Sequence, residues 1–304
     1  MIDKYLEPDS ILEHWGLSGE AVEFVKKSLN STTWYIGEKH VLRQQQNKEK
    51  MLRNIQLTNL LNENHVPAVK FVKTLSGEWT APDGAYYLME RIKGEHIDFF
   101  ESPEAAYELG RGLAQLHETL LKNESTLEYN DYDFVSEWEN YTKPGLVGVS
   151  PVLVEETEMR IRKLSEKLPR CPIHRDVYSG NVLFHDGKIS GWLDFELNRK
   201  DVRIYDLAYF LSGLIAGKID NPQAIETWKI IKRNLLAGYG EASPLSGEET
   251  EAIPFLMIVV NLLFVTYWNN IGKPEESINA KKLAEWLFST QHEMSTYMKF
   301  NTRD

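Results

Sequence analysis

The sequence is poor in the features that mark several large classes of protein. Its single cysteine, Cys171, excludes an internal disulfide framework and indicates a reducing compartment. Acidic residues outnumber basic ones by 45 to 34, and the net charge of −11 argues against a nucleic-acid partner, because phosphates require a basic surface. The first residues lack a basic segment followed by an apolar one, so we expect no signal peptide and a cytoplasmic location.

Long uninterrupted hydrophobic runs are also missing. The most apolar stretch, residues 252–268, is short for a membrane span and is interrupted by Pro254 and Asn261. We therefore expect a buried helix here and no membrane association. The chain also lacks internal repeats and long linkers, and its 304 residues suffice for one large domain or two lobes with a buried core.

The most informative segment that is present covers residues 171–196, CPIHRDVYSGNVLFHDGKISGWLDFE. Its triplet HRD at 174–176 is followed by Asn181, five positions after Asp176, and a later D-F pair begins at Asp194. This spacing is typical of phosphoryl transfer, in which one aspartate accepts a hydroxyl proton while an asparagine and a second aspartate hold magnesium. The alternative is a chance triplet among ordinary surface acids around a hairpin.

The local geometry favours the first interpretation. The Asp-Gly pair at 186–187 is a strong hairpin signal between two apolar, β-branched segments. A two-residue turn would place Asp194 opposite Ser179, with Asn181 two positions away on the same face. Their side-chain oxygens would then converge where magnesium and phosphate oxygens fit. Asp176 lies on the preceding loop, which suits a base that must meet a separate substrate.

This segment resembles the catalytic core of the aminoglycoside phosphotransferase and choline kinase superfamily, which has a protein-kinase-like fold. Residues 204–208, IYDLA, are similar to the Y-D-L-A that follows the metal-binding aspartate in that family. The resemblance implies a two-lobed α+β fold. A small N-lobe with an antiparallel sheet, residues 1–92, would bind the nucleotide. A larger, mostly helical C-lobe, residues 93–304, would carry the catalytic and acceptor sites.

The resemblance also assigns roles around the triplet. The enzyme would use ATP and Mg²⁺, with Asp176 as the catalytic residue that accepts the hydroxyl proton and with Asn181 and Asp194 as metal ligands. Asp206 would anchor the catalytic loop through backbone N–H groups. His174 would hold the loop backbone by hydrogen bonds, and the neighbouring arginine would either do likewise or contact phosphate.

The N-terminal part alternates short apolar segments with one helical pattern. The phosphate-covering loop of a kinase-like N-lobe would here lack a G-x-G-x-x-G and would offer Ser31, Thr32 and backbone N–H groups. Arg43 takes the place of the family's phosphate-binding lysine, and a planar guanidinium also clamps phosphate. Glu49 lies early in the helix that should supply its carboxylate partner. We predict strands over 21–29, 32–36, 40–44, 69–74, 77–81 and 86–92, and a helix over 48–62.

The apolar segment 86–92, YYLMERI, resembles the hinge strand that joins the two lobes of such enzymes. By this resemblance Met89 would abut adenine. The carbonyl of Glu90 and the N–H of Ile92 would bind its edge. The alternative is an ordinary core strand, since these contacts use the main chain and leave side-chain identity free.

From residue 94 onward the pattern becomes helical. A capping serine and a proline at 102–103 predict a helix start, and leucines at helical spacing predict a buried stripe beside His117, which we expect to be a satisfied core histidine. Residues 122–150 form either a substrate-facing insertion or a packed connection. Further helices are predicted over 151–168, 222–238, 248–271 and 277–298.

The acceptor is expected to be a small molecule. Only eleven residues separate Asp194 from Asp206, and no A-P-E signature follows, whereas a protein kinase needs a long activation segment there. Candidate acceptors are an amino alcohol, a homoserine-like metabolite, a sugar or an aminoglycoside, with a slight preference for a metabolite. Alternatives are a catalytically weak nucleotide-binding module of the same fold and, less favoured, a protein kinase. The sequence leaves the oligomeric state open.

Overall fold

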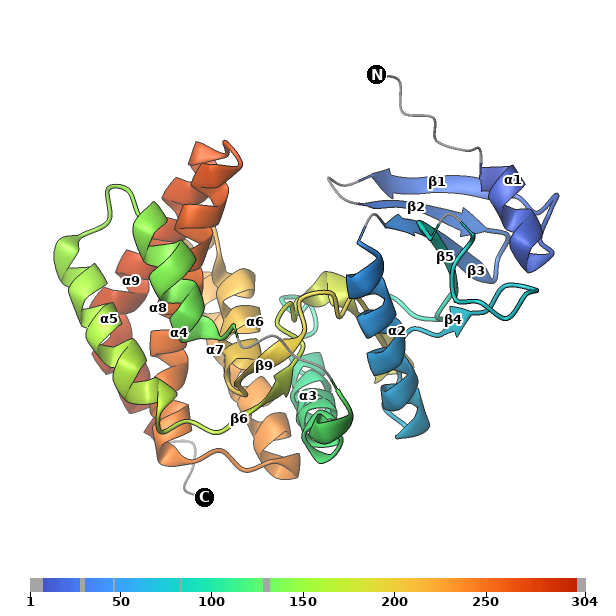
Figure 1. Cartoon of the computed structure of the whole chain (residues 1–304). Helices are drawn as coiled ribbons and strands as arrows, with labels where there is room; N and C mark the ends of the chain where they lie inside the picture. Colours follow the sequence, from blue (N-terminus) through green and yellow to red (C-terminus); the bar gives the residue numbers. More distant parts are fainter. Residues whose placement is uncertain (1–7, 28–30, 46, 83, 128–131, 300–304) are drawn as a thin grey trace. The chain divides into compact units, whose positions relative to one another are not determined.

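The computed structural model describes residues 8–27, 31–45, 47–82, 84–127 and 132–299 (Figure 1). Its contacts divide the chain into two compact units, and neither is one continuous stretch. Unit 1 consists of Met1–Glu95, Leu183–Asp186 and Ser190–Glu196, and unit 2 consists of His96–Val182, Gly187–Ile189 and Leu197–Asp304. The lobe boundary after residue 92 stays a prediction.

Unit 1 is built around a five-stranded antiparallel sheet of order β1-β2-β3-β5-β4. Helix α2 (Lys48–Glu63) begins after Asn47, whose side chain accepts the N–H of Lys50 at 3.0 Å. This helix and the first three strands lie where the sequence predicts them. The strands are β1 (Val22–Lys27), β2 (Ser31–Ile36), β3 (His40–Gln45), β4 (Phe71–Val72) and β5 (Tyr86–Glu90).

Of the strands predicted in unit 1, the one over 69–74 is shorter than predicted and the one over 77–81 is wrong. The strand β4 is only two residues long, and no strand covers 77–81. The reason is a tight loop, in which the Thr74 N–H donates to the Glu78 carbonyl at 2.7 Å and the Glu78 N–H donates to the Thr74 hydroxyl at 3.0 Å. Gly77 in this loop has a φ of 86°, a left-handed conformation that strands do not contain.

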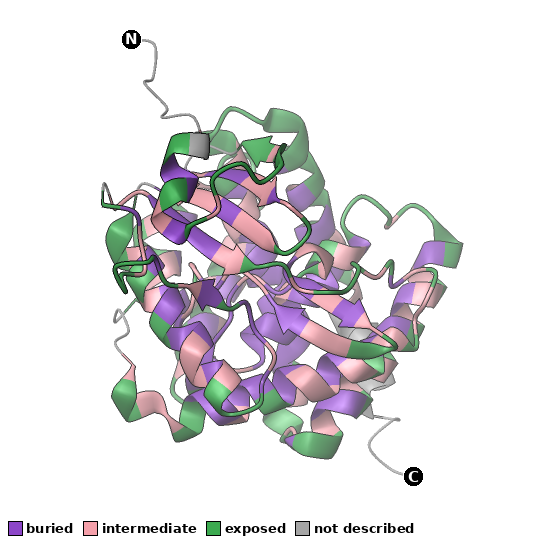
Figure 2. Ribbon diagram, turned by 90° about the vertical axis from the view of Figure 1, so that its right-hand side faces the viewer, coloured by how far each residue is buried: buried purple, intermediate pink, exposed green. Residues whose placement is uncertain are grey.

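The two faces of the sheet are covered differently. Alternation along β5 places Tyr86 and Leu88 in one apolar cluster and Tyr87 in the other. The first cluster includes Leu12 from the short helix α1 (Pro8–Leu12), and the second includes Met51 from α2. Figure 2 colours the buried residues of the chain purple.

A second sheet is the hairpin of β7 (Val182–His185) and β8 (Lys188–Trp192). Asp186 and Gly187 have φ values of 50° and 72°, as a two-residue primed turn requires, so the predicted turn is confirmed. The ladder is shorter than predicted. Asn181 belongs to a 3₁₀ turn before β7, and Asp194 follows the end of β8 with a φ of 57°. The register argument that placed both on one face is therefore wrong.

Unit 2 is mostly helical, with one two-stranded sheet of β6 and β9 that the sequence did not reveal. Helix α3 begins at residue 105 and not at the predicted serine, because residues 98–102 close a separate turn on the Asp98 carbonyl. Helix α6 was also not predicted. The elements are α3 (Ala105–Lys122), α4 (Phe134–Glu137), α5 (Pro151–Ser165), β6 (Arg170–Ile173), β9 (Arg199–Val202), α6 (Tyr205–Ile215), α7 (Pro222–Ala242), α8 (Gly247–Asn270) and α9 (Pro274–Lys299).

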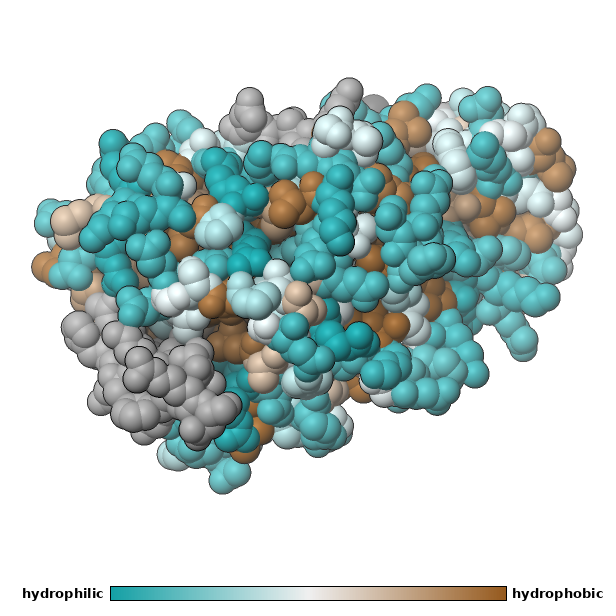
Figure 3. All heavy atoms as spheres, turned by 90° about the horizontal axis from the view of Figure 1, so that it is seen from below, coloured by the Kyte–Doolittle hydropathy of each residue, from teal (hydrophilic) through white to brown (hydrophobic). Residues whose placement is uncertain are grey.

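The core of unit 2 contains the helix that the sequence marks as most apolar. Helix α8 has the length and hydropathy of a membrane span, but 72% of its apolar window is buried. It packs against α6 and α9, and Ile253, Leu256 and Val260 are fully buried, which confirms the predicted buried helix. Exposed large hydrophobic side chains are scattered along the chain, and hydrophilic residues cover most of the face shown in Figure 3.

Candidate active site

The carboxylate of Asp176 is fixed at both oxygens within unit 2. Its Oδ1 accepts the hydroxyl of Tyr209 at 2.7 Å, and its Oδ2 accepts Nδ2 of Asn181 at 2.9 Å. The same Nδ2 lies 2.9 Å from the Asp176 carbonyl. The structure thus brings together Asp176 and Asn181, which the sequence singled out. Tyr209 was missed, although it directly follows the Y-D-L-A motif on α6.

The loop that contains residues 174–176 is anchored by Asp206, as predicted. This fully buried side chain accepts the N–H of His174 at 2.8 Å and the N–H of Arg175 at 2.7 Å. Nε2 of His117 lies 3.0 Å from the same carboxylate, and Nδ1 of His117 lies 2.9 Å from the hydroxyl of Tyr239. Because a carboxylate only accepts, Nε2 carries the proton. His117 is therefore the satisfied core histidine that the sequence predicted.

The other two residues of the triplet also act inside the loop. Nδ1 of His174 accepts the N–H of Asp176 at 3.3 Å, which confirms its predicted role in holding the backbone. Arg175 has a φ of 76°, and its side chain is only 6% exposed. The guanidinium lies 4.0 Å from the ring centroid of Tyr205 and pairs with Glu137. In this structure Arg175 therefore makes internal contacts.

Unit 1 holds Arg43 between two carboxylates. Both terminal nitrogens of Arg43 lie 3.3 Å from Oδ2 of Asp194, and Nη2 lies 3.0 Å from Oε1 of Glu196. Gln45 donates to the same Oε1 at 2.8 Å. The glutamate partner of Arg43 is therefore Glu196 and not Glu49 of α2, and Asp194 is its second carboxylate partner. Burial works against the charged guanidinium, yet Tyr87 and the two carboxylates hold the pKa of Arg43 above its ordinary value.

The two predicted metal ligands each keep one oxygen available. Among the described residues, Oδ1 of Asp194 and Oδ1 of Asn181 have no hydrogen-bond donor. Carboxylate and amide oxygens are the ligands that Mg²⁺ prefers. The described residues contain no group of three His, Cys, Asp or Glu side chains poised for a metal ion. Each available oxygen, taken by itself, is of the type that Mg²⁺ takes when it binds through one or two protein ligands with phosphates and water.

The predicted phosphate-covering residues lie at the start of β2. Ser31 and Thr32 are the first residues of this strand, and not part of a link as expected. Thr32 is buried and pairs with Lys27 and Gln44 in the sheet, while the hydroxyl of Ser31 lies 3.4 Å from Nη2 of Arg43. Residues 28–30, the centre of the expected loop, lie outside the described residues.

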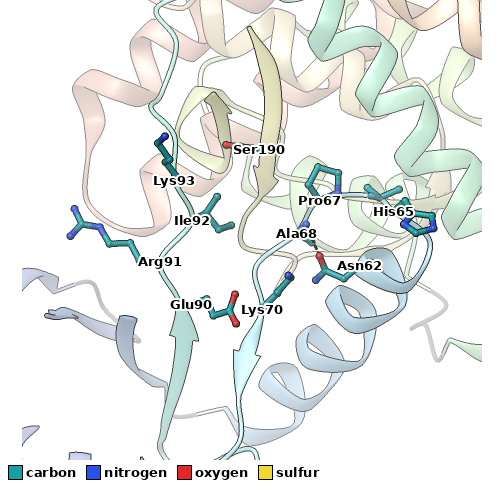
Figure 4. A pocket seen from close by; sticks show the side chains of 11 residues that line it. Asn62, His65, Pro67, Ala68, Lys70, Glu90, Arg91, Ile92, Lys93 and Ser190 are labelled. Carbon is teal, nitrogen blue, oxygen red and sulfur yellow. Dashed lines mark hydrogen bonds between the residues drawn. The ribbon is translucent and has the colours of Figure 1, made fainter. Parts of the chain in front are cut away.

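The predicted hinge residues are the last two residues of β5, Met89 and Glu90, and Ile92 just after it. Met89 pairs with strands on both sides of β5, and the Glu90 N–H donates to the Lys70 carbonyl at 2.8 Å. Among the described residues, the N–H of Ile92 has no acceptor. Glu90 and Ile92 line a cavity of about 470 Å³ within unit 1, from which the side chain of Arg91 points away (Figure 4).

Comparison with known proteins gives consistent matches. The model of the phosphotransferase enzyme family matches residues 22–244. A homoserine kinase of Acidiphilium cryptum is 32% identical over 143 residues, which cover 46% of this chain and 42% of the relative. A homoserine kinase of Brucella anthropi is 27% identical over 183 residues, which cover 57% and 54%. The chain thus spans about half the length of the curated relatives it matches.

Solved structures share the fold along nearly the whole chain. An amicoumacin kinase, hAmiN, solved in complex with AMP-PNP, Ca²⁺ and Ami, has a TM-score of 0.75 at 15% identity, covering 93% of both chains. A microcompartment-associated aminopropanol kinase has a TM-score of 0.71 at 14% identity, covering 93% of this chain and 97% of the other. These similarities confirm the predicted α+β, protein-kinase-like fold.

Proposed function

Because the chain belongs to the phosphotransferase enzyme family, we propose that it is a small-molecule kinase that transfers the γ-phosphate of ATP to a hydroxyl group. The foremost acceptor is homoserine or a similar amino alcohol, and the curated homoserine kinases support this choice. The observation that carries the proposal is the Asp176 carboxylate, fixed at both oxygens on an anchored loop. We place the reaction in the cytoplasm, where the buried Cys171 thiol stays reduced.

Asp176 is assigned to the acceptor hydroxyl. Each carboxylate oxygen has a second lone pair, so the contacts with Asn181 and Tyr209 leave Asp176 able to accept the hydroxyl proton. These two contacts limit rotation of the carboxylate and hold it in one orientation. Since the transition state of phosphoryl transfer is loose, the proton moves late and the main task of Asp176 is to orient the hydroxyl.

The nucleotide and metal are assigned to the remaining candidate residues. A bound Mg²⁺ would neutralise charge on the β- and γ-phosphates. Asn181 and Asp194 would hold it through their available oxygens, while Arg43 steadies the phosphates. Ser31 and Thr32 would contribute further phosphate contacts, and adenine would lie against Met89, Glu90 and Ile92.

The first experiment is magnesium-dependent release of ADP from ATP in the presence of homoserine, 1-amino-2-propanol, choline, a sugar and an aminoglycoside. We expect turnover with an amino alcohol. Asp176→Asn keeps the shape of the side chain but removes the base, so turnover should fall by about 10²- to 10⁴-fold. The matched control is Asp186→Asn at the hairpin turn, where the carboxylate is 89% exposed and the activity should not change.

Two results would count against this proposal. Tight ATP binding without turnover on any acceptor would favour the nucleotide-binding module. Turnover that persists in Asp176→Asn would contradict the role of Asp176.

A further inference from the structure

A cluster of four charged side chains with no net charge lies in unit 2 and includes Arg175, the residue that precedes Asp176. It consists of two arginines, Arg175 and Arg199, and two carboxylates, Glu137 and Asp201. Glu137 is 15% exposed and Asp201 is fully buried, while the two arginines are 6% and 10% exposed. Groups so far removed from water keep their charge only when they are paired.

Glu137 joins the two arginines. Its Oε2 accepts a hydrogen bond from Nη2 of Arg175. The same oxygen lies 3.2 Å from Nη2 of Arg199, and Oε1 lies 3.5 Å from Nη1 of Arg199. Asp201 contacts Arg199 directly, at 3.0 Å from Nη2 and 3.1 Å from Nε, and its charge acts on Arg175 without a direct ion pair among the described residues. Among the described residues, Glu137 is therefore the one carboxylate in an ion pair with Arg175.

The segment that carries Glu137 is itself fixed. The short helix α4 begins after Asp133, which accepts the N–H of Ser136 at 3.0 Å and pairs with Arg170 at 3.0 Å. Phe134, the first residue of this helix, and Trp138, which follows its last residue, are 2% and 1% exposed. Of the two alternatives for residues 122–150, this part is thus a packed connection. It presents a carboxylate at a defined place.

Arg175 needs such a contact because its backbone is strained. It has a φ of 76°, and residues other than glycine hold a left-handed conformation only where the surroundings fix it. Asp206 fixes its N–H group, the ring of Tyr205 lies against its guanidinium, and Glu137 neutralises its charge. The next residue is Asp176, so any change in the backbone of Arg175 moves the carboxylate.

We propose that Glu137 is a positioning residue, which acts through Arg175 to hold the catalytic loop in the conformation that presents Asp176. This inference rests on the proposed function, since Asp176 is assigned there. The loop needs no phosphorylated segment or other anion from outside, because Glu137 supplies the negative charge permanently. In kinases whose loops are ordered by phosphorylation, an arginine–phosphate pair makes a similar contact.

Glu137→Gln removes the charge and retains the length of the side chain. We expect kcat to fall by about 10- to 100-fold, because small displacements of a reacting group have effects of this size. The KM for ATP should change less than about twofold. A variant that had lost its fold would not keep its KM for ATP, so this measurement separates mispositioning of Asp176 from unfolding. Glu137→Asp keeps the charge at a shorter reach and should recover part of kcat.

The matched control is Glu139→Gln, two residues farther along the same segment. Glu139 is 46% exposed and pairs with Arg162 on the surface, so its substitution should leave kcat unchanged. A folded Glu137→Gln variant with the same kcat as Glu139→Gln would overturn the proposal. If Glu137→Gln does not fold, Glu137→Asp is compared with the control in the same way.

A second measurement separates this inference from the proposed function. Amide hydrogen exchange of residues 170–181, without substrate, should be faster in the Glu137 variants and unchanged in Glu139→Gln, while α7 keeps its protection. An unchanged rate in the loop, or an equal increase in α7, would overturn the role of Glu137. A wild-type chain without kinase activity would contradict the proposed function, whereas the exchange rates would still decide the role of Glu137.

Discussion

The charged side chain of Arg43 forms ion pairs with two carboxylates that lie far along the chain, those of Asp194 and Glu196. Hydrogen bonds to charged groups contribute about 1.5–3 kcal/mol when they are shielded from water. Glu196 is 18% exposed, accepts both Arg43 and Gln45, and is therefore the stronger candidate for stabilising this part of unit 1.

We predict that Glu196→Gln lowers the free energy of unfolding by about 1.5–3 kcal/mol, because Arg43 then loses a charged partner. The midpoint of urea unfolding measures this change. Glu49→Gln is the control, since Glu49 lies exposed in the first turn of α2 and its substitution should have an effect within about 0.5 kcal/mol. A larger loss in Glu49→Gln than in Glu196→Gln would contradict the pairing described here.

For single residues, the sequence predicts the contacts between residues that lie close together in the chain. Asp176 and Asn181 are five positions apart on one loop, so their association follows from the pattern alone. Tyr209 reaches Asp176 across 33 positions, and Gln45 reaches Glu196 across 151. No local spacing encodes such contacts, because they arise only when separate elements pack together. Glu49 was considered as the partner of Arg43 because the family resemblance places a glutamate on the helix that follows, whereas the observed partner Glu196 lies far along the chain.

Among the helices, α3 and α7 approach each other at two glycines. A Cβ atom on Gly110 would lie 2.0 Å from the carbonyl oxygen of Leu235, and one on Gly238 would lie 2.0 Å from that of Tyr107. These are backbone atoms and have little freedom to move. The crossing therefore requires residues without side chains, which is a constraint on the element pair and not on either helix alone.

We predict that Gly110→Ala destabilises the protein by about 1–3 kcal/mol, because the helices must move apart. Thermal unfolding followed by circular dichroism measures the effect. Gly240→Ala on α7 is the control. A Cβ there meets nothing within 4 Å, so the substitution should stabilise the helix by about 0.5–1 kcal/mol. Effects of the same sign at both positions would be inconsistent with the close crossing.

Elements with a strong local signal are the ones that the sequence predicts. The turn at Asp186 and Gly187 and the leucine stripe of α3 are examples, and the four leucines of that stripe are fully buried. Helix α6 was missed because it is buried on most of its surface and has no polar face to reveal a period. The sheet of β6 and β9 was missed because it joins segments such as Cys171 and Asp201, which are far apart in sequence.

For the whole molecule, stability at alkaline pH depends on a buried cation. Lys232 on α7 is 6% exposed and has no ion pair among the described residues, and its nitrogen lies 5.2 Å from the ring centroid of Trp228. Burial, with a smaller effect of Lys229, lowers the pKa of Lys232 from 10.5 to about 8. Between these two pH values the unfolded chain binds more protons than the native one, so stability increases with pH through this range.

We predict that Lys232→Met raises the free energy of unfolding at pH 7 by up to about 3 kcal/mol, because the cost of burying the charge disappears. This gain should shrink as the pH rises from 8 to 10.5, where native wild-type Lys232 is neutral. Urea unfolding at pH 7 and pH 10 measures the difference. Lys229→Met, which alters a 36% exposed lysine paired with Glu226, removes only the smaller of the two causes and should give a much smaller gain. A gain that does not depend on pH would disprove the explanation.

The division of unit 1 along the chain has a consequence for its biosynthesis. Arg43 enters the sheet early, yet its partner Asp194 lies 151 positions later, in a segment that also belongs to unit 1. Since domains fold as units while the chain leaves the ribosome, this unit cannot complete its charge pairing until well over half of the protein has been translated. A nascent chain that stalls before residue 190 would expose an unpaired arginine on an unfinished sheet. Unit 1 therefore completes its folding late, although most of its residues are synthesised first.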